Sequence, residues 1–158
     1  MALFAAAALG IQLRLLCNLL DGMVAIEGGR KTRSGELFNE LPDRLSDVLI
    51  LVCAGYASTA TAWSEALGWA AAVLAVLTAY VRAFGASLTG AQHFVGPMAK
   101  AHRMAVMTGA CLIAALQAWL GAAPSVLPLA LALIVVGCLV TLVRRTRLIL
   151  ADLEAPRG

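Results

Sequence analysis

The segment NLLDGMVAIEGGRKTRSGELFNELPDRLSD, residues 18–47, decides how this chain of 158 residues is interpreted. It places carboxylates and amides at helical spacing beside apolar runs that are long enough to span a bilayer. Polar groups at that depth are unfavourable, so they indicate a functional site. Between them stand Gly22, Gly28, Gly29 and Gly35, which would let a phosphate or a nucleotide approach the backbone closely.

The polar residues form two rows, one on each side of the glycines. Asn18 and Asp21 are three residues apart, so they share one face of a helix. Asn39, Asp43 and Asp47 follow at intervals of four and stack above one another on the next helix. Two such rows facing each other would bring several oxygen ligands to one place. A hard divalent cation such as Mg²⁺ or Mn²⁺ requires that arrangement.

A second interpretation of the segment is a solvated loop between two membrane spans, in which the glycines form turns. For the basic cluster RKTR at 30–33, a solvated loop and a role in countering phosphate charge both stay open. For the polar rows a solvated loop explains less, because Asp43 and Asp47 run directly into the apolar sequence VLILVCAGYA at 48–57.

At these residues the chain resembles the CDP-alcohol phosphatidyltransferase family, whose signature reads D-x2-D-G-x2-A-R-x8-G-x3-D-x3-D. Every spacing agrees over the 26 residues 18–43, and five of the eight signature positions are identical. The matching residues are Asn18, Asp21, Gly22, Ala25, Ile26, Gly35, Asn39 and Asp43. The resemblance implies an integral membrane enzyme of phospholipid biosynthesis. Such an enzyme moves a phosphatidyl or related phosphoalcohol group from a CDP-linked lipid to an alcohol and releases CMP.

Three positions depart from the pattern of the family. Asn18 and Asn39 stand where the family has aspartates, and Ile26 replaces the arginine. An amide oxygen still ligates Mg²⁺ but brings no negative charge, so we expect weaker metal binding or a different arrangement of the ions. Asp47, one turn beyond the signature, is a candidate for a compensating carboxylate. The chain is similar to a bacterial branch of the family that has asparagine at both places.

Carried over to this sequence, the resemblance implies a metal site and a catalytic base. The implied ligands of one or two Mg²⁺ or Mn²⁺ ions are Asn18, Asp21, Asn39 and Asp43. Asp43 also matches the proposed general base of the family, which takes the proton of the acceptor hydroxyl, and Asp47 is the alternative base. The residues expected to border the donor or its phosphates are Gly22, Ala25, Gly35, Arg82 and Lys100.

Arg82 and Lys100 are singled out because they flank the connection between two later apolar runs, on the side that holds the signature. Fixed cations there would stabilise the charge on a phosphoryl group during transfer. The alternative is that they only mark the cytoplasmic side of the membrane. For Arg103 and His102 the two interpretations are equally open. The pair Arg82 and Lys100 favours a phosphorylated acceptor.

The composition is that of a membrane protein. Hydrophobic residues make up 61% of the chain and charged residues 13%, and the mean hydropathy is +0.88, outside the usual range of soluble domains. We predict an all-α polytopic helix bundle with a single domain at 1–150 and a short cytoplasmic tail at 151–158. About five spans of bilayer length are expected, at 2–20, 45–61, 67–84, 104–120 and 126–143.

The distribution of charge predicts the orientation. With the signature loop in the cytoplasm, nearly all Lys and Arg residues lie at the inner face, whereas the connections at 58–66 and 121–125 contain none. The active site is therefore expected on the cytoplasmic side, and the resemblance to the bacterial branch implies the inner membrane of a bacterium. Arg14, inside the first run, either pairs with a signature carboxylate or a phosphate, or extends to the inner interface. A basic inner face attracts anionic lipids and explains the net charge of +3 without nucleic acid.

The resemblance further implies homodimers and six spans, so a first span is expected to be missing from this sequence. A signal peptide is disfavoured because no basic residues precede the apolar start. Two other functions stay open. One is a CDP-lipid-binding or scaffold protein with this fold and impaired catalysis, suggested by Asn18, Asn39 and Ile26. The other is a transporter. It is less favoured because the acidic residues gather at one face of the membrane instead of being distributed across the bilayer.

Overall fold

The computed structural model describes residues 1–27, 35–58 and 61–155. Every regular element in these ranges is a helix. The helices are α1 (Ala2–Glu27), α2 (Gly35–Tyr56), α3 (Ser64–Thr89), α4 (Lys100–Trp119) and α5 (Val126–Glu154). The predicted all-α bundle is thereby confirmed. The glycines and basic residues at 28–33 lie outside the described ranges.

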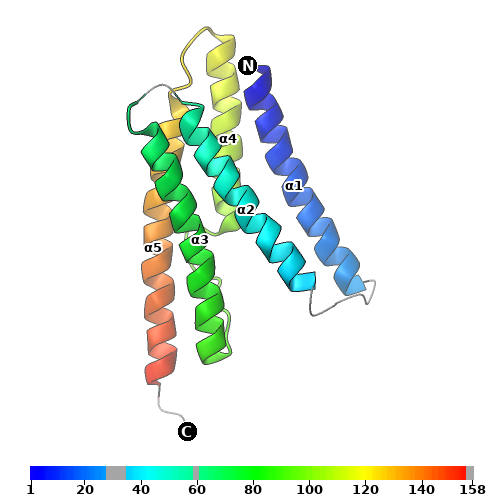
Figure 1. Cartoon of the computed structure of the whole chain (residues 1–158), viewed down its shortest axis with the longest axis vertical. Helices are drawn as coiled ribbons and strands as arrows, with labels where there is room; N and C mark the ends of the chain where they lie inside the picture. The colour runs from blue at the N-terminus through cyan, green and yellow to red at the C-terminus, as the bar shows by residue number, and fades with distance from the viewer. Residues whose placement is uncertain (28–34, 59–60, 156–158) are drawn as a thin grey trace.

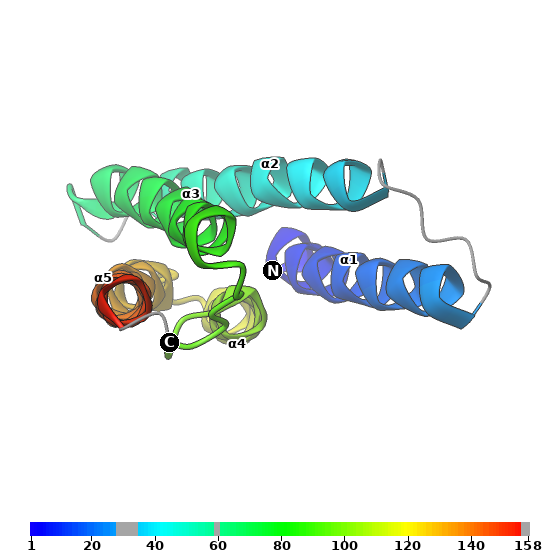
Figure 2. The same cartoon turned by 90° about the horizontal axis from the view of Figure 1, so that it is seen from below.

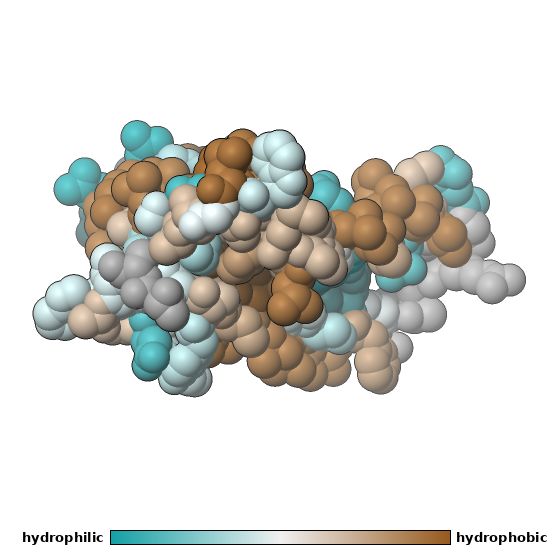
Figure 3. Space-filling view, turned by 90° about the horizontal axis from the view of Figure 1, so that it is seen from above, coloured by the Kyte–Doolittle hydropathy of each residue, from teal (hydrophilic) through white to brown (hydrophobic). Residues whose placement is uncertain are grey.

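Three helices in the described part of the chain are long and apolar enough to cross a membrane. They are α1 over Ala2–Val24, α3 and α5. Large apolar side chains also reach the surface over much of the molecule, as expected for a protein whose solvent is lipid (Figure 3). The chain is therefore a membrane protein. A crossing by the shorter and more polar α2 and α4, which the five-span topology requires, stays a prediction.

The helices form two packed groups. α3 packs against both α2 and α5, and α1 packs mainly against α4 (Figure 1). The α2–α3 and α4–α5 connections lie at one end, here called the outer end, and the last turns of α1 and α5 lie at the other, the inner end. Figure 2 shows α4 and α5 nearly end-on while α1 and α2 lie across the view. The inner ends of α1 and α2 therefore lean away from the other helices.

Glycine allows α2 and α3 to approach closely near the outer end. A Cβ placed on Gly68 would lie 2.9 Å from the carbonyl oxygen of Leu51, and one on Gly55 would lie 2.7 Å from that of Ser64. Small residues that bring helix backbones together are a common feature of membrane bundles. The two glycines thus let α2 pack directly against α3.

A non-helical segment at 90–99 joins α3 to α4, and Met98 is its buried residue. It starts where α3 ends at Gly90, which has a φ of 74° and donates its N–H to Ala86. It then returns along α3 to the middle of the bundle, where α4 begins (Figure 1). Gly96 has a φ of 135°, and a Cβ there would lie 2.4 Å from the side chain of Thr141. Only glycine suits that position.

Buried side chains hydrogen-bond to the backbone of two residues in the 90–99 segment, Met98 and Val95. The N–H of Met98 donates to Thr141 Oγ1 at 3.0 Å, and its carbonyl accepts from Arg103 Nη1 at 3.0 Å. The carbonyl of Val95 accepts from Arg145 Nε at 2.9 Å. Irregular backbone at membrane depth requires such partners. α4 therefore starts near the middle of the bundle (Figure 1), and the side chain of its first charged residue, Lys100, is 27% exposed.

Candidate functional site

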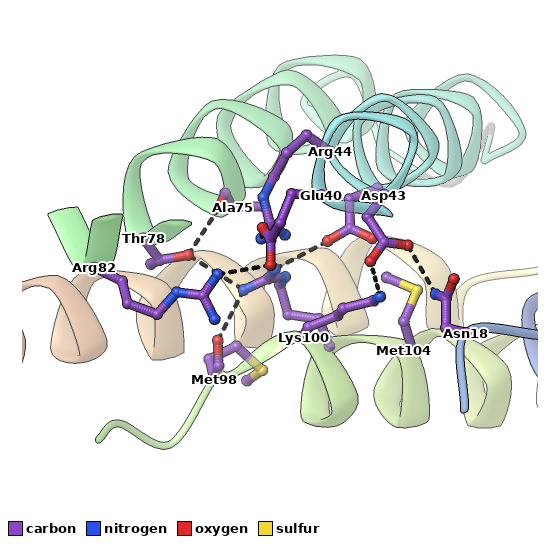
Figure 4. A network of polar contacts seen from close by, with 12 residues as sticks. Asn18, Glu40, Asp43, Arg44, Ala75, Thr78, Arg82, Met98, Lys100 and Met104 are labelled. Carbon is purple, nitrogen blue, oxygen red and sulfur yellow. Dashed lines mark hydrogen bonds and ion pairs between the residues drawn. The ribbon is translucent and has the colours of Figure 1, made fainter. Parts of the chain in front are cut away.

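The two polar rows meet where α1, α2 and α4 come together (Figure 4). Asn18 Nδ2 of α1 donates to Asp43 Oδ1 of α2 at 2.8 Å. These residues stand at the first and last positions of the signature spacing. α1 and α2 run in opposite directions. The contact between Asn18 and Asp43 therefore determines which residues of the two rows lie opposite each other.

Asp43 is surrounded by donors from two other helices. Arg14 Nη2 bonds its Oδ1 at 3.0 Å and its backbone oxygen at 2.9 Å, and Lys100 Nζ pairs with its Oδ2. Asp43 precedes the apolar run of α2, and its side chain is 11% exposed. Desolvation raises the pKa of Asp43, but the hydrogen bonds from Lys100, Arg14 and Asn18 outweigh it, so the net pKa is lowered. The carboxylate is ionised at neutral pH.

Asp47 lies one turn further along α2 and is more deeply buried, with 2% of its side chain exposed. Its Oδ2 accepts a hydrogen bond from Arg103 Nη2 at 2.9 Å. Its Oδ1 lies 2.7 Å from Arg14 Nη2, an ion pair without hydrogen-bond geometry. Arg103, itself buried, also donates from Nη1 to Thr78 Oγ1 at 3.3 Å. Both oxygens of Asp47 therefore face cations of the protein.

Arg14 is thus an ion-pair partner of both carboxylates, which is one of the two roles considered for it. Five of the charged residues of α1, α2 and α4 alternate in sign through space, in the order Lys100, Asp43, Arg14, Asp47 and Arg103. Alternation of this kind neutralises charges that would be very unfavourable if each were buried singly.

The other predicted ligands lie outside this cluster. Asp21 and Asn39 are each one turn nearer the inner end, on the parts of α1 and α2 that lean away, and both side chains are exposed. Gly22 lies beside Asp21, with open space where a Cβ would be. Gly35 is the first residue of α2, and Ala25 lies in the last turns of α1.

The residues of the two rows suit a hard divalent cation by their chemistry. Asn18 donates from Nδ2 to Asp43, so its amide oxygen does not take part in this bond and could ligate a metal ion. Asp21 and Asn39 supply further oxygens on the same two helices. Within the described residues, no three His, Cys, Asp or Glu side chains lie close enough together to hold a metal ion. The metal site therefore stays a prediction that rests on donor type and on the Asn18–Asp43 contact.

A pocket of about 380 Å³ opens beside the cluster and has basic walls. Residues of α1, α2, α3, α4 and α5 border it, among them Asn18. Its five basic residues are Arg44, Arg82, Lys100, Arg103 and Arg145. Both Arg82 and Lys100, which the sequence singled out, therefore border one space with Asn18.

Positive charge exceeds negative charge in this region. The pocket and the adjoining ion pairs contain six cations and three carboxylates, the latter being Glu40, Asp43 and Asp47. Arg145 is 5% exposed and donates to the backbone oxygens of Val95 and Thr78, the latter at 2.6 Å. It forms no ion pair within the described residues. A buried guanidinium bonded only to carbonyls favours an anionic ligand nearby.

Glu40 is a residue of this region that sequence reasoning missed. Its Oε1 accepts from Arg82 Nη2 at 2.9 Å, and its Oε2 pairs with Arg44 one turn along α2 (Figure 4). Arg82 also lies over the ring of Phe94, 5.1 Å from its centre. The spacing of Glu40 and Arg44 by four residues was a signal for the local pair. The contact with Arg82 of α3 depends on the tertiary structure.

Two further spaces adjoin the site. One, of about 510 Å³, lies beyond Arg82 and is bordered also by Asn39 and Glu40. The other is an apolar cleft of about 480 Å³ toward the outer end, where α1 and α2 are joined by residues of α4 and α5. Its walls include Phe4, Ile11, Ile50, Cys53 and Met107. The apolar cleft and the basic pocket lie on opposite sides of the charged cluster along α1.

We compared the chain with protein-family models, with curated proteins and with solved structures, and none of the three comparisons found a match.

Proposed function

We propose that this protein is a membrane transferase that moves a phosphatidyl or related phosphoalcohol group from a CDP-linked lipid, such as CDP-diacylglycerol, to an alcohol, with release of CMP. The observation that carries the proposal is the contact of Asn18 with Asp43, at the two ends of the signature spacing, beside a pocket with five cations. A fixed carboxylate next to excess positive charge suits phosphoryl transfer.

In this proposal Asp43 is the general base. Its ionised carboxylate, held by Arg14 and Lys100, takes the proton of the acceptor hydroxyl. The hydroxyl oxygen then forms a bond to the phosphorus of the lipid phosphate, and the bond from that phosphorus to the CMP oxygen breaks. The electron pair of the broken bond leaves with CMP, whose charge the cations of the pocket stabilise.

A divalent cation, Mg²⁺ or Mn²⁺, would be held by oxygens of Asn18, Asp21, Asn39 and Asp43, and when bound it would neutralise the pyrophosphate of the donor. The apolar cleft of about 480 Å³ would receive an acyl chain of the donor, because its walls are apolar and it is bordered by α1 and α2, the helices that carry the signature residues.

The excess of positive charge supports a phosphorylated alcohol as the acceptor. Arg145 has no carboxylate partner within the described residues, and Lys100 and Arg82 border the same pocket. A neutral alcohol would leave Arg145 without an anionic partner, whereas a phosphate group would pair with it and attract Lys100 and Arg82 as well. The site would face the cytoplasm of a bacterial cell, where soluble phosphorylated alcohols are found.

The test is CMP release from CDP-diacylglycerol by the purified full chain in detergent, with Mg²⁺ or Mn²⁺ and a pool of alcohols that includes glycerol 3-phosphate, an inositol phosphate and serine. We expect Asp43→Asn to lower the rate by about 10²-fold to 10⁴-fold, the usual contribution of a general base. The matched control is Asp152→Asn, which removes a carboxylate that pairs with His93 away from the pocket. Equal rates in the wild type and in Asp43→Asn would contradict the proposal.

A second candidate is a CDP-lipid-binding protein without transferase activity. It is favoured by one observation, namely that Asp43 and Asp47 are already paired with cations of the protein. Saturable binding of CDP-diacylglycerol, with no CMP release for any alcohol in the pool, would support it.

A further inference from the structure

The three carboxylates of the charged region differ sharply in exposure. Asp43 and Asp47 are buried, whereas the side chain of Glu40 is 51% exposed. Glu40 lies where the basic pocket meets the space beyond Arg82, and it borders that second space. It is therefore the carboxylate of this region that a ligand entering from the inner end would meet.

Another anion could readily replace Glu40 in its ion pairs with Arg44 and Arg82. An exposed carboxylate that pairs with arginines contributes little to stability, because water and salt screen the attraction. Its two partners, Arg44 and Arg82, are themselves largely covered and are both part of the wall of the basic pocket. Replacement of Glu40 by another anion would therefore leave the fold intact and keep both arginines paired.

Arg82 has a second support that does not depend on Glu40. Its guanidinium lies over the ring of Phe94, which borders both spaces. A cation held by an aromatic face keeps its position when its carboxylate partner leaves. The planar fork of Arg82 would then present paired donors to phosphate oxygens.

We propose that Glu40 is an internal competitor for the basic pocket: its carboxylate occupies Arg44 and Arg82 until the phosphate group of a ligand displaces it. The proposal deepens the proposed function by assigning a specificity residue to the same pocket. A doubly charged phosphate displaces Glu40, and a singly charged or neutral ligand does not. Glu40 thus selects for phosphate-bearing ligands.

The experiment measures binding of inorganic phosphate to the full chain in neutral detergent by isothermal titration calorimetry. Removal of the competitor in Glu40→Gln is expected to tighten phosphate binding by about fivefold to tenfold. The matched control is Glu65→Gln, which removes the same charge from the first turn of α3 at the outer end. Binding in Glu40→Gln that is no tighter than in this control would overturn the proposal.

Two further arms identify the pathway of the effect and the source of the phosphate. In Glu40→Gln/Arg82→Gln the gain should vanish, and a gain that persists would show that Arg82 is not the competed residue. Nanodiscs containing phosphatidic acid, compared with phosphatidylcholine, test whether the phosphate belongs to a lipid headgroup. If Glu40→Gln tightens the binding of phosphatidic acid alone, the phosphate belongs to a lipid headgroup. If it tightens the binding of free phosphate, the ligand is soluble. These readouts need no CMP release, so failure of the transferase assay and failure of this proposal are separable.

Discussion

Asp43 and Asp47 are one turn apart on α2, yet their surroundings assign them different tasks. Asp43 borders Asn18 and Lys100 at the edge of the basic pocket, whereas Asp47 is enclosed by Arg103 and Arg14. A base must reach the proton that it abstracts. We therefore expect Asp47 to position the arginines and Asp43 to contact the substrate.

A double-mutant cycle tests the role of Asp47. Asp47→Asn leaves Arg103 buried without its carboxylate and should lower the free energy of unfolding by about 3–5 kcal/mol. Addition of Arg103→Gln should restore much of that loss, because the unpaired charge is then gone. Thermal unfolding of the two single variants and the double variant in detergent measures this coupling. If Asp47 were the base, CMP release would be lost in Asp47→Asn as fully as in Asp43→Asn, at temperatures where both variants are folded.

The lowered pKa of Asp43 predicts how stability depends on pH. Because the folded state favours the ionised form, the ion pairs of Asp43 contribute fully above its ordinary pKa of 3.8 and are lost as the pH falls through the lower, folded value. The wild type should therefore lose more thermal stability between pH 6 and pH 3 than Asp43→Asn does. Parallel melting curves with equal losses would contradict this assignment.

At the scale of helices, the contact between α2 and α3 depends on two glycines. A methyl group at position 68 would lie 2.9 Å from a backbone oxygen of α2, so Gly68→Ala should lower the free energy of unfolding by about 1–3 kcal/mol. The control is Gly109→Ala in α4, where a Cβ meets nothing within 4 Å, and alanine should be neutral or stabilising by up to about 1 kcal/mol. Equal melting temperatures for both variants would exclude close packing at Gly68.

The apolar runs predicted which helices exist but not where they end. The runs at 2–20 and 126–143 become helices that continue to Glu27 and Glu154. Polar residues after each run keep the backbone helical, but they are not part of the apolar pattern from which the helices were predicted. The start of α4 near the middle of the bundle could not be predicted either. It depends on the buried bonds of Arg103 and Arg145 to the 90–99 segment, and composition does not report such contacts.

For the candidate site, helical spacing predicted which residues share a face of one helix. The distribution of charge predicted which side of the membrane the site faces. Spacing predicted that each row shares one face of its helix, and the hypothesis of a metal site required the two rows to face each other; Asn18 and Asp43 are in contact. It did not predict that Asp21 and Asn39 lie apart from them, because the tilt of α1 and α2 is set by packing against other helices. Glu40 and Arg145 could not be assigned to the site from the sequence, because their contacts are with residues distant in sequence.

At the scale of the whole molecule, the charge distribution predicts one orientation in the membrane. In a variant without the four native cysteines, a cysteine at Ala122, in the uncharged α4–α5 connection, should react with an impermeant maleimide added outside cells. A cysteine at Gln92, in the segment after α3, should react only after permeabilisation. The reverse labelling pattern would invert the orientation and place the basic pocket outside.

The alternating charges of the cluster also have a consequence for how a cell makes this protein. If α2 crosses the membrane, as the five-span prediction requires, it brings Asp43 and Asp47 to the bilayer before the cations of α4 have been synthesised, because helices leave the ribosome in sequence. Arg14, on the helix made just before, contacts both carboxylates, and each unpaired charge at the centre of a lone helix opposes insertion by about 2.5–3.5 kcal/mol. We therefore expect α1 and α2 to enter as a hairpin that Arg14 partly neutralises. Later arrival of α4, with Lys100 and Arg103, would complete the ion pairs, so that insertion and folding are a single process for this chain.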